Sequence, residues 1–328
     1  MLVVTGATGH IGNVLVRGLL AQGRQVRALV PPFEDTRPLA GLDVELVRGD
    51  VRDPDSLRCA FAGASVVYHL GGLISILPGR AKALHATNVV GTQNVIQACL
   101  DGGVERMVYV SSVHALVEPP HGTAITEEAG CDPRKVVGAY AKSKAQATLA
   151  VREAAARGLD TVIIFPSGVI GPYDFNRSEM GQVILDFARR RLPACVDGAY
   201  DFVDVRDVAD GIVRAGLRGR TGEGYILSGG VLPVPRLMEL LQELTGVRAP
   251  SLRLPRRVAM AAAVFTSLFS AVTGAKPRFA SYSIRVLGSN CLISCAKARR
   301  ELDYAPRPIE ETLADTVQWF RMHGMMWT

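Results

Sequence analysis

A glycine pattern close to the first methionine constrains the fold of this chain more than any other feature. The apolar run Leu2–Thr5 leads into Gly6-Ala7-Thr8-Gly9-His10-Ile11-Gly12, and an apolar helical pattern continues to Gln22. Glycines at 6 and 9 allow a tight turn and close approach of a diphosphate, and Gly12 lets the helix pack against the strand. The free N–H groups and positive dipole end of that helix would face the diphosphate. The pattern therefore predicts the start of a dinucleotide-binding βαβ unit.

Short apolar runs alternate with helical patterns up to about residue 170, which is typical of βαβ units and a parallel sheet. Most runs lack strict polar–apolar alternation, as expected when helices cover both faces of the sheet. Asp53-Pro54 has the composition of a helix start, with an acid at the N-cap and proline in the first turn. We expect strands over 2–5, 25–30, 44–48, 65–70, 106–111 and 161–165, and helices over 11–22, 55–60, 81–100 and 139–157.

The regular alternation ends after Gly171-Pro172. Beyond it we expect helices over 178–191, 234–245 and 308–323 and short strands over 202–205 and 225–227. The sequence thus predicts an α/β protein. Residues 1–170 would form a Rossmann-like, doubly wound parallel sheet, and 171–328 a smaller, mixed substrate lobe with some segments returning to that sheet.

Charge and cysteine content limit the class of partner. The chain has 37 lysines and arginines against 31 aspartates and glutamates, a net charge of +6. It has no basic run and no basic stripe interleaved with aromatic residues, so we expect a small molecule and not nucleic acid as its partner. Six cysteines show no C-x-x-C pair and no zinc-like spacing, so we expect no metal site and a reducing, cytoplasmic compartment. The start of the sequence has no signal-peptide pattern.

One uncharged segment, Val258–Ala275, reaches the lower length limit of a membrane-spanning helix. Alanine, serine, threonine and glycine dominate it, and these residues gain little on transfer to lipid. We therefore expect a buried or lid-like helix over a substrate cleft. Peripheral attachment to a membrane through 258–275 is the alternative, because Arg256-Arg257 precedes the segment.

A second group of residues has the composition of a proton-transfer site. Tyr140 and Lys144 lie four residues apart in a helical segment, hence on one face. A phenol has an unperturbed pKa of about 10, and a neighbouring ammonium lowers that pKa by favouring the phenolate. Ser111 and Ser112 end the fifth expected strand, at the carboxyl edge where open α/β sheets bind ligands. Asn88 is expected either to donate to the backbone or a relay water, or to be a core amide.

These motifs together resemble the extended branch of the short-chain dehydrogenase/reductase superfamily, which includes the NAD-dependent epimerases and dehydratases. Within it, the chain is similar to the dihydroflavonol-4-reductase-like proteins. The G-x-x-G-x-x-G spacing carries the resemblance, and further matches extend it over essentially the whole chain. They are Gly49-Asp50-Val51, Tyr68-His69-Leu70-Gly71-Gly72, Asn88-Val89-Val90-Gly91-Thr92, Tyr140-Ala141-Lys142-Ser143-Lys144, Phe202–Ala209 and Ala298–Tyr304.

The resemblance implies hydride transfer between a nicotinamide and a carbonyl carbon. Tyr140 would donate or accept the proton, Ser112 would polarise the carbonyl oxygen, and Lys144 would hold the ribose and lower the pKa of Tyr140, with Asn88 completing the catalytic set. It also implies a homodimer through helices 81–100 and 139–157. The residues expected to bind the cofactor are Gly6, Thr8, Gly9, His10, Ile11, Gly12, Arg27, Asp50, Val51, Leu70, Gly71, Gly72, Ser111, Tyr140, Lys144, Pro166, Ser167 and Val169.

The second expected strand bears on the choice of cofactor. It ends in Arg27-Ala28-Leu29-Val30-Pro31-Pro32, without an acid at its tip to bind an adenosine 2′-hydroxyl. Proline stands where many NADP-using relatives have arginine. Because Arg27 or Arg37 would be able to bind a 2′-phosphate instead, we favour NADP over NAD.

The leading hypothesis is therefore an NAD(P)H-dependent oxidoreductase that interconverts a carbonyl and an alcohol. A sugar-nucleotide epimerase or dehydratase is the alternative, with Arg177, Arg189–Arg191 or Arg253 to bind a diphosphate. The uncharged segment 258–275 favours a less polar substrate. A non-catalytic, dinucleotide-sensing regulator is the third candidate, although such proteins usually lack the tyrosine–lysine pair.

Overall fold

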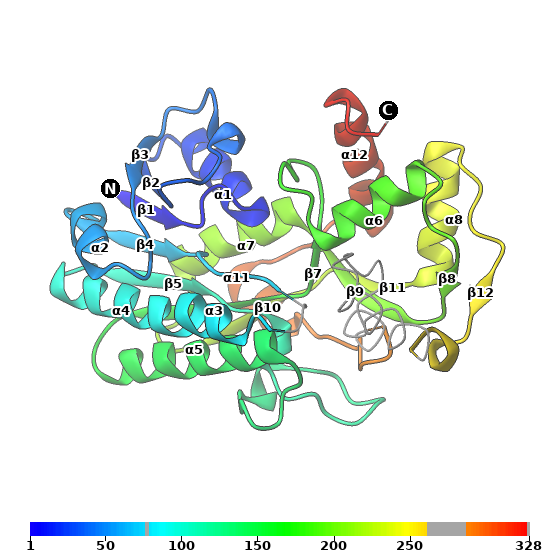
Figure 1. Ribbon diagram of the computed structural model, residues 1–328. Coiled ribbons are helices and arrows are strands. Elements are labelled where there is room, and N and C mark those ends of the chain that lie inside the picture. The colour runs from blue at the N-terminus through cyan, green and yellow to red at the C-terminus, as the bar shows by residue number, and fades with distance from the viewer. Residues whose placement is uncertain (76–78, 261–286, 327–328) are drawn as a thin grey trace.

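A seven-stranded, wholly parallel sheet forms the centre of the first lobe (Figure 1). The computed structural model describes residues 1–75, 79–260 and 287–326. The strand order is β10-β6-β5-β4-β1-β2-β3, so the order reverses at β1, which has β2 on one side and β4 on the other. Ligands of open α/β sheets bind at the carboxyl ends of the strands beside such a reversal. The predicted doubly wound α/β fold is confirmed. The strands are β1 Leu2–Thr5, β2 Val26–Val30, β3 Glu45–Arg48, β4 Val66–His69, β5 Arg106–Val110, β6 Thr161–Pro166 and β10 Gly224–Leu227.

Helices cover both faces of this sheet, which explains why its strands read as continuous apolar runs. In β1, Leu2 and Val4 point into one hydrophobic core while Val3 points into the other. The first core lies under α1 His10–Ala21, α7 Val205–Arg218 and α11 Ala296–Leu302. The second lies under α2 Pro54–Phe61, α4 Gly91–Asp101 and α5 Ala139–Ala156, on the opposite face in Figure 1.

The local signals predicted the start of one helix correctly and the interior of another poorly. Asp53 is the N-cap of α2, where its side chain accepts from the N–H of Asp55, and Pro54 follows as expected. The helix expected over 81–100 is present, but it is not uniform. It consists of α3 Ala81–Leu84, the π-helical turn η2 His85–Val90 and then α4. Such π turns are frequent at functional sites, and this one contains Asn88.

The second lobe has a small mixed sheet of its own. Its order is β11-β9-β7, with β7 Gly168–Ile170 parallel and β11 Gly230–Pro233 antiparallel to β9 Ala199–Asp204. β8 Cys195–Val196 and β12 Arg253–Leu254 form a further parallel pair. Helices α6 Glu179–Ala188, α8 Val234–Thr245 and α12 Ile309–Met322 pack around a third core. The strand expected over 202–205 ends at Asp204, which caps α7, a helix that the sequence did not predict.

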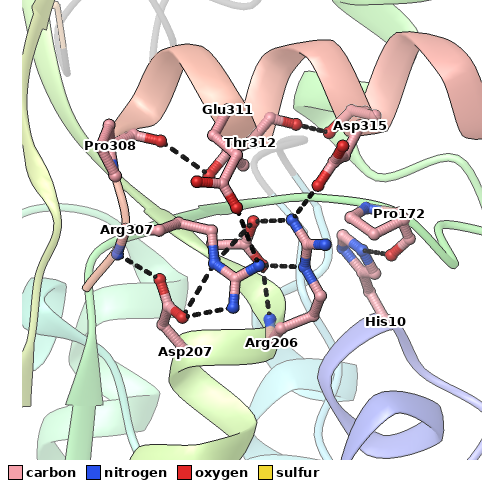
Figure 2. Close-up of polar contacts among 11 residues, drawn as sticks. His10, Pro172, Arg206, Asp207, Arg307, Pro308, Glu311, Thr312 and Asp315 are labelled. Carbon is pink, nitrogen blue, oxygen red and sulfur yellow. Dashed lines mark hydrogen bonds and ion pairs between the residues drawn. The ribbon is translucent and has the colours of Figure 1, made fainter. Parts of the chain in front are cut away.

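An ion-pair network connects α7 to the start of α12 (Figure 2). Both carboxylate oxygens of Asp207 accept from Arg307, from its backbone N–H at 2.8 Å and from its guanidinium at 2.9 and 3.0 Å. Arg206 bridges Asp204 and Asp315, each at 2.7 Å. Since α7 packs on the seven-stranded sheet and α12 on the third core, this network holds the two lobes together.

Two further expectations concern compartment and membrane. All six cysteines lie in the described part of the chain, and all are free. Of the segment 258–275, only residues 258–260 are described, so the expected lid-like helix lies outside the described residues. Among the helices that are described, none is long and apolar enough to cross a bilayer.

Candidate active site

The glycine turn between β1 and α1 is closed tightly against the loop that follows β4. Gly6 has φ +69°, and a Cβ on it would lie 2.8 Å from the backbone nitrogen of Gly71. A Cβ on Gly12 would lie 2.0 Å from the carbonyl oxygen of Gly6. The first turn of α1 has no acidic residue, and no side chain caps it. The first turn of α1 therefore presents N–H groups that no side chain caps, which suits a diphosphate.

Residues 172–176 of the second lobe are bonded directly to this turn. His10 Nε2 donates to the carbonyl of Pro172 at 3.0 Å (Figure 2), and Asn13 Nδ2 donates to that of Tyr173 at 3.1 Å. In return, Asn176 Nδ2 donates to the carbonyl of Thr8 at 3.0 Å. The predicted cofactor residues Thr8 and His10 thus also join the lobes, a role that their sequence positions did not indicate.

The end of β4 is fixed by a buried histidine. His69 Nδ1 and Thr5 Oγ1 are 2.7 Å apart, and His69 Nε2 lies 3.0 Å from Thr92 Oγ1. Burial, with a smaller effect of the Lys144 charge, lowers the pKa of His69 to about 3, so the imidazole is neutral. Thr5 Oγ1 also accepts from the N–H of Gly71 at 3.0 Å. The predicted Leu70–Gly72 segment is therefore held beside the glycine turn.

Lys144 is buried at the carboxyl end of β5. Only 5% of the residue is exposed, and Nζ donates to the carbonyl of Val110 at 2.8 Å. Nζ also lies 5.1 Å from the centre of the Tyr109 ring. Burial lowers the pKa of Lys144 to about 8. A Cβ on Gly72 would lie 3.5 Å from this ammonium, so the Gly71-Gly72 pair leaves the group room at the sheet edge.

Asn88 connects the π turn to the helix that carries Tyr140. Its Nδ2 donates to the carbonyl of Leu73 at 2.9 Å and to Ser143 Oγ at 3.0 Å, while Oδ1 accepts from the N–H of Leu73 at 2.7 Å. Ser143 Oγ in turn donates to the carbonyl of Tyr140 at 2.8 Å. Of the roles that the sequence left open, the structure thus shows donation to the backbone.

The two serines after β5 have different surroundings. Ser111 Oγ lies 2.7 Å from Thr148 Oγ1 on α5, one turn beyond Lys144. Ser112 Oγ accepts from the N–H of His114, whose Nε2 lies 2.9 Å from the hydroxyl of Tyr200 on β9. Burial lowers the pKa of His114 to about 4. The contact brings β9 of the second lobe to the serine loop, and no sequence pattern indicated a role for Tyr200.

The structure does not bring Arg27 to this edge. Its guanidinium donates to the carbonyls of Ala60 and Ala62 at 2.9 and 2.8 Å and pairs with Glu45. These partners lie at and beyond the carboxyl end of α2, so the Arg27 side chain points away from the carboxyl ends of the strands, where the cofactor is expected. Arg37 is paired with Asp35 at 2.5 Å.

Glu34, an acid that the sequence analysis did not identify, lies at the glycine turn. Thr8 Oγ1 donates to Glu34 Oε1 at 2.5 Å. Glu34 is four residues beyond the last residue of β2, so a search limited to the tip of that strand overlooked it. Arg48 Nη1 holds the loop by donating to the carbonyls of Pro31 and Glu34.

The remaining predicted residues lie at the ends of β3 and β6. Asp50 is paired with Arg52 at 2.6 Å, and hydrogen bonding from Arg52 lowers the pKa of this carboxyl. Val51 is buried, and a Cβ on Gly91 would lie 2.7 Å from its side chain. Ser167 N donates to the carbonyl of Leu227 at 3.1 Å, which fixes the segment after Pro166 to β10. Val169 follows in β7.

Comparisons with known proteins identify the family and the fold. Residues 2–227 match the family described as the NAD dependent epimerase/dehydratase family. Sterol demethylase protein B of Methylococcus capsulatus is 39% identical over 329 residues, covering 99% of both chains. A putative dihydroflavonol 4-reductase of Synechocystis is 35% identical over 329 residues, covering 99% of this chain and 96% of the relative. The solved dTDP-glucose 4,6-dehydratase DesIV of Streptomyces venezuelae, with NAD bound, has a TM-score of 0.80 at 26% identity and covers 99% of this chain and 98% of its own.

Proposed function

Because the chain belongs to the NAD-dependent epimerase/dehydratase family, as its motifs predicted, we propose that it is a reductase that interconverts a carbonyl and an alcohol. Its cofactor is a nicotinamide dinucleotide. One observation carries the proposal. Lys144 is buried at the carboxyl end of β5, one helical turn from Tyr140 and next to the serines that follow the strand.

The described residues fit a dinucleotide. The glycine turn and the uncapped start of α1 would hold the diphosphate, since Cβ atoms at Gly6 or Gly12 would collide with backbone. Asp50 and Val51 would lie at the adenine, and Leu70–Gly72 and Pro166–Val169 would flank the nicotinamide half. The bound cofactor supplies the hydride, and the protein supplies orientation and charge.

The chain's own residues would then move the proton. Tyr140 donates it from its phenol to the carbonyl oxygen, which Ser112 polarises through its hydroxyl. Lys144 favours the phenolate that remains and holds the ribose. Asn88 is a positioning residue, since its amide holds the turn of α5 that carries Tyr140 through Ser143.

The sequence favoured NADP, but the position of Glu34 leads us to propose NAD as the preferred cofactor. Its carboxylate lies at the glycine turn, where it would accept from an adenosine 2′-hydroxyl and repel a 2′-phosphate. Of the two cations that supported NADP, Arg27 is bonded to the end of α2, and Arg37 is paired with Asp35 in the exposed loop after β2.

A sugar-nucleotide epimerase or dehydratase is the second candidate, because DesIV has the same fold. The reductase is preferred because the full-length relative named as a reductase is more similar, at 35% against 26% identity. Four of the arginines considered for a substrate diphosphate, Arg177, Arg190, Arg191 and Arg253, are exposed on the second lobe and have no acidic partner among the described residues. Absorbance of NADH with ketones and with sugar nucleotides separates the two activities. Net oxidation by ketones supports the reductase, and conversion of a sugar nucleotide without net oxidation contradicts it.

We also propose that the chain forms a homodimer through α4 and α5. Val90, the last residue of η2 directly before α4, and Leu149 on α5 expose large apolar side chains. Light scattering after size exclusion would measure twice the monomer mass. Leu149→Lys would then lower that mass to one monomer, and a native chain that elutes as a monomer contradicts the proposal.

A further inference from the structure

Two neighbouring segments of the second lobe concentrate the positive charge of the whole chain. Residues 189–197 and 246–260 contain seven arginines and one aspartate, Asp197, a net charge of +6. This equals the net charge of the entire protein, so the positive and negative charges of all other residues cancel. The sequence reading found no basic run because the arginines are divided between two distant stretches.

The fold brings these stretches together at one edge. β8 and β12 pair, with Cys195 opposite Arg253 and Val196 opposite Leu254. The N–H of Cys195 donates to the carbonyl of Leu252 at 2.9 Å. Figure 1 shows this pair at the end of the molecule opposite α2. We call residues 189–197 and 246–260 the arginine edge.

The arginines of this edge are exposed, and acids do not neutralise them. Arg106 and Arg307 elsewhere have carboxylate partners at 2.6 and 2.9 Å. Among the described residues, no carboxylate pairs with the six arginines of the edge that are exposed. They are Arg190, Arg191, Arg248, Arg253, Arg256 and Arg257. Unpaired, exposed guanidinium groups attract an anionic partner.

Apolar side chains lie among these arginines. Leu252 is 53% exposed and Val258 is 52% exposed. A cavity of about 460 Å³ opens at the same edge, with Arg190 and Arg248 beside Phe187, Leu192 and Pro250. The combination of cations, exposed aliphatic side chains and a cation-lined cavity matches the headgroup and upper acyl region of an anionic bilayer. Nucleic acid would instead call for exposed aromatic residues, and 246–260 contains none.

We propose that the arginine edge docks the protein on the surface of a membrane that contains anionic lipids. The exposed arginines contact lipid phosphates, and Leu252 and Val258 enter the interface. This would place a water-soluble fold beside a substrate that partitions into the membrane. The docking requires neither the catalytic assignment of Tyr140 nor any bound cofactor.

Flotation of the full chain with lipid vesicles tests the proposal. One preparation is phosphatidylcholine with about one third phosphatidylglycerol, and the other is phosphatidylcholine alone. We expect binding to the anionic vesicles only, weakened strongly by salt because exposed charges are screened. Equal binding to both preparations, or no binding to either at low salt, overturns the proposal.

Charge reversal locates the surface. Each arginine near an anionic surface contributes about fivefold in affinity, so Arg253→Glu/Arg257→Glu should lower the affinity for anionic vesicles at least about 25-fold. Arg24→Glu/Arg157→Glu is the matched control, because both residues are exposed on the first lobe and have no described acidic partner. We expect it to retain binding within about threefold. An equal loss in the control means attraction by net charge alone and overturns the proposal.

A second pair of substitutions tests whether apolar side chains enter the membrane. Leu252→Ser/Val258→Ser should weaken vesicle binding without changing net charge, whereas unchanged binding contradicts insertion of this edge.

Competition experiments test whether another anionic ligand binds the arginine edge instead of a membrane. Inorganic phosphate should displace vesicles no better than chloride at equal ionic strength, and stronger displacement identifies a free-phosphate site instead. Duplex DNA that competes as well as anionic vesicles also overturns the proposal. If the glutamate double variant fails to fold by circular dichroism, Arg253→Gln/Arg257→Gln replaces it, with the same direction expected.

Discussion

Lys144 Nζ donates to the backbone carbonyl of Val110 at 2.8 Å, which joins the middle of α5 to the last residue of β5. The bond holds the ammonium at the carboxyl edge of the sheet, one turn from Tyr140 and directly before Ser111 and Ser112. A buried lysine held by a carbonyl keeps a positive charge where a phenolate would need it. The chemistry proposed for this protein depends on that placement.

Replacing the phenol should remove turnover and leave the cofactor bound. Tyr140→Phe lacks the proton donor, so we expect carbonyl reduction to fall by about 10²-fold or more. Tyr225→Phe is the control, since Tyr225 is fully buried in β10 and bonds to Glu301. NADH absorbance measures turnover, and the thermal shift caused by NADH measures binding. Retained turnover in Tyr140→Phe contradicts the proton-donor assignment.

Glu34 should determine the preference between NADH and NADPH. Glu34→Ser removes the carboxylate at Thr8 and with it the repulsion of a 2′-phosphate, so the ratio of kcat/KM for NADH over NADPH should fall by about tenfold or more. Glu45→Ser removes another carboxylate, which pairs with Arg27 away from the site, and should leave the ratio unchanged. A ratio that already favours NADPH in the native enzyme would sink this prediction.

Stability should fall in acid because His69 is buried and neutral. Its pKa drops from 6.5 in the unfolded chain to about 3 in the fold, so the unfolded chain binds more protons between these values. The resulting stabilisation is present above pH 6.5 and is lost as the pH falls toward 3. Between pH 7 and 5 the loss is about 2 kcal/mol. Urea unfolding of His69→Asn should show a pH dependence weaker by that amount, and an identical dependence in both chains contradicts the burial effect.

The ion pair between Asp207 and Arg307 should stabilise the fold more than a surface pair. The Asp207 side chain is only 9% exposed, so Asp207→Asn removes the nearest charge partner of a partly buried guanidinium, which keeps only Asp204 at 3.6 Å and Glu311 at 3.5 Å, and should lower the free energy of unfolding by about 3 kcal/mol. Asp55→Asn breaks the pair with Arg58, whose side chains are 80% and 60% exposed, and should cost less than about 1 kcal/mol. Equal losses in urea unfolding would mean that the network in Figure 2 does not join the lobes.

The sequence was sufficient where a local pattern determines structure by itself. Strand β1, the glycine turn and the cap at Asp53 each follow from a few adjacent residues. It was insufficient for elements without periodicity, since β8 and β12 have two residues each and depend on one another. Helix α7 was missed although its apolar face packs on α1, because the strand pattern before it was extended to Val205.

Long side chains were the main source of error at the site. The position of Arg27 in β2 determines which face of the sheet its side chain lies on, but not toward which end of the strand the side chain extends. In the structure it extends to the carbonyls of Ala60 and Ala62 at the end of α2. Glu34 reaches Thr8 from a loop whose path no periodicity predicts. The Tyr200–His114 contact likewise joins two lobes and needs the tertiary fold. The glycines and serines are simpler to locate, because the turn after β1 and the end of β5 place their backbone directly.

The most direct test of the account is a crystal structure of the protein with NAD bound. We predict the diphosphate at the glycine turn and the nicotinamide at the carboxyl end of β5, with the Tyr140 hydroxyl beside the ring and Lys144 Nζ on the ribose. A Tyr140 hydroxyl that points away from the ring, or a dinucleotide bound elsewhere, would contradict the proposed chemistry.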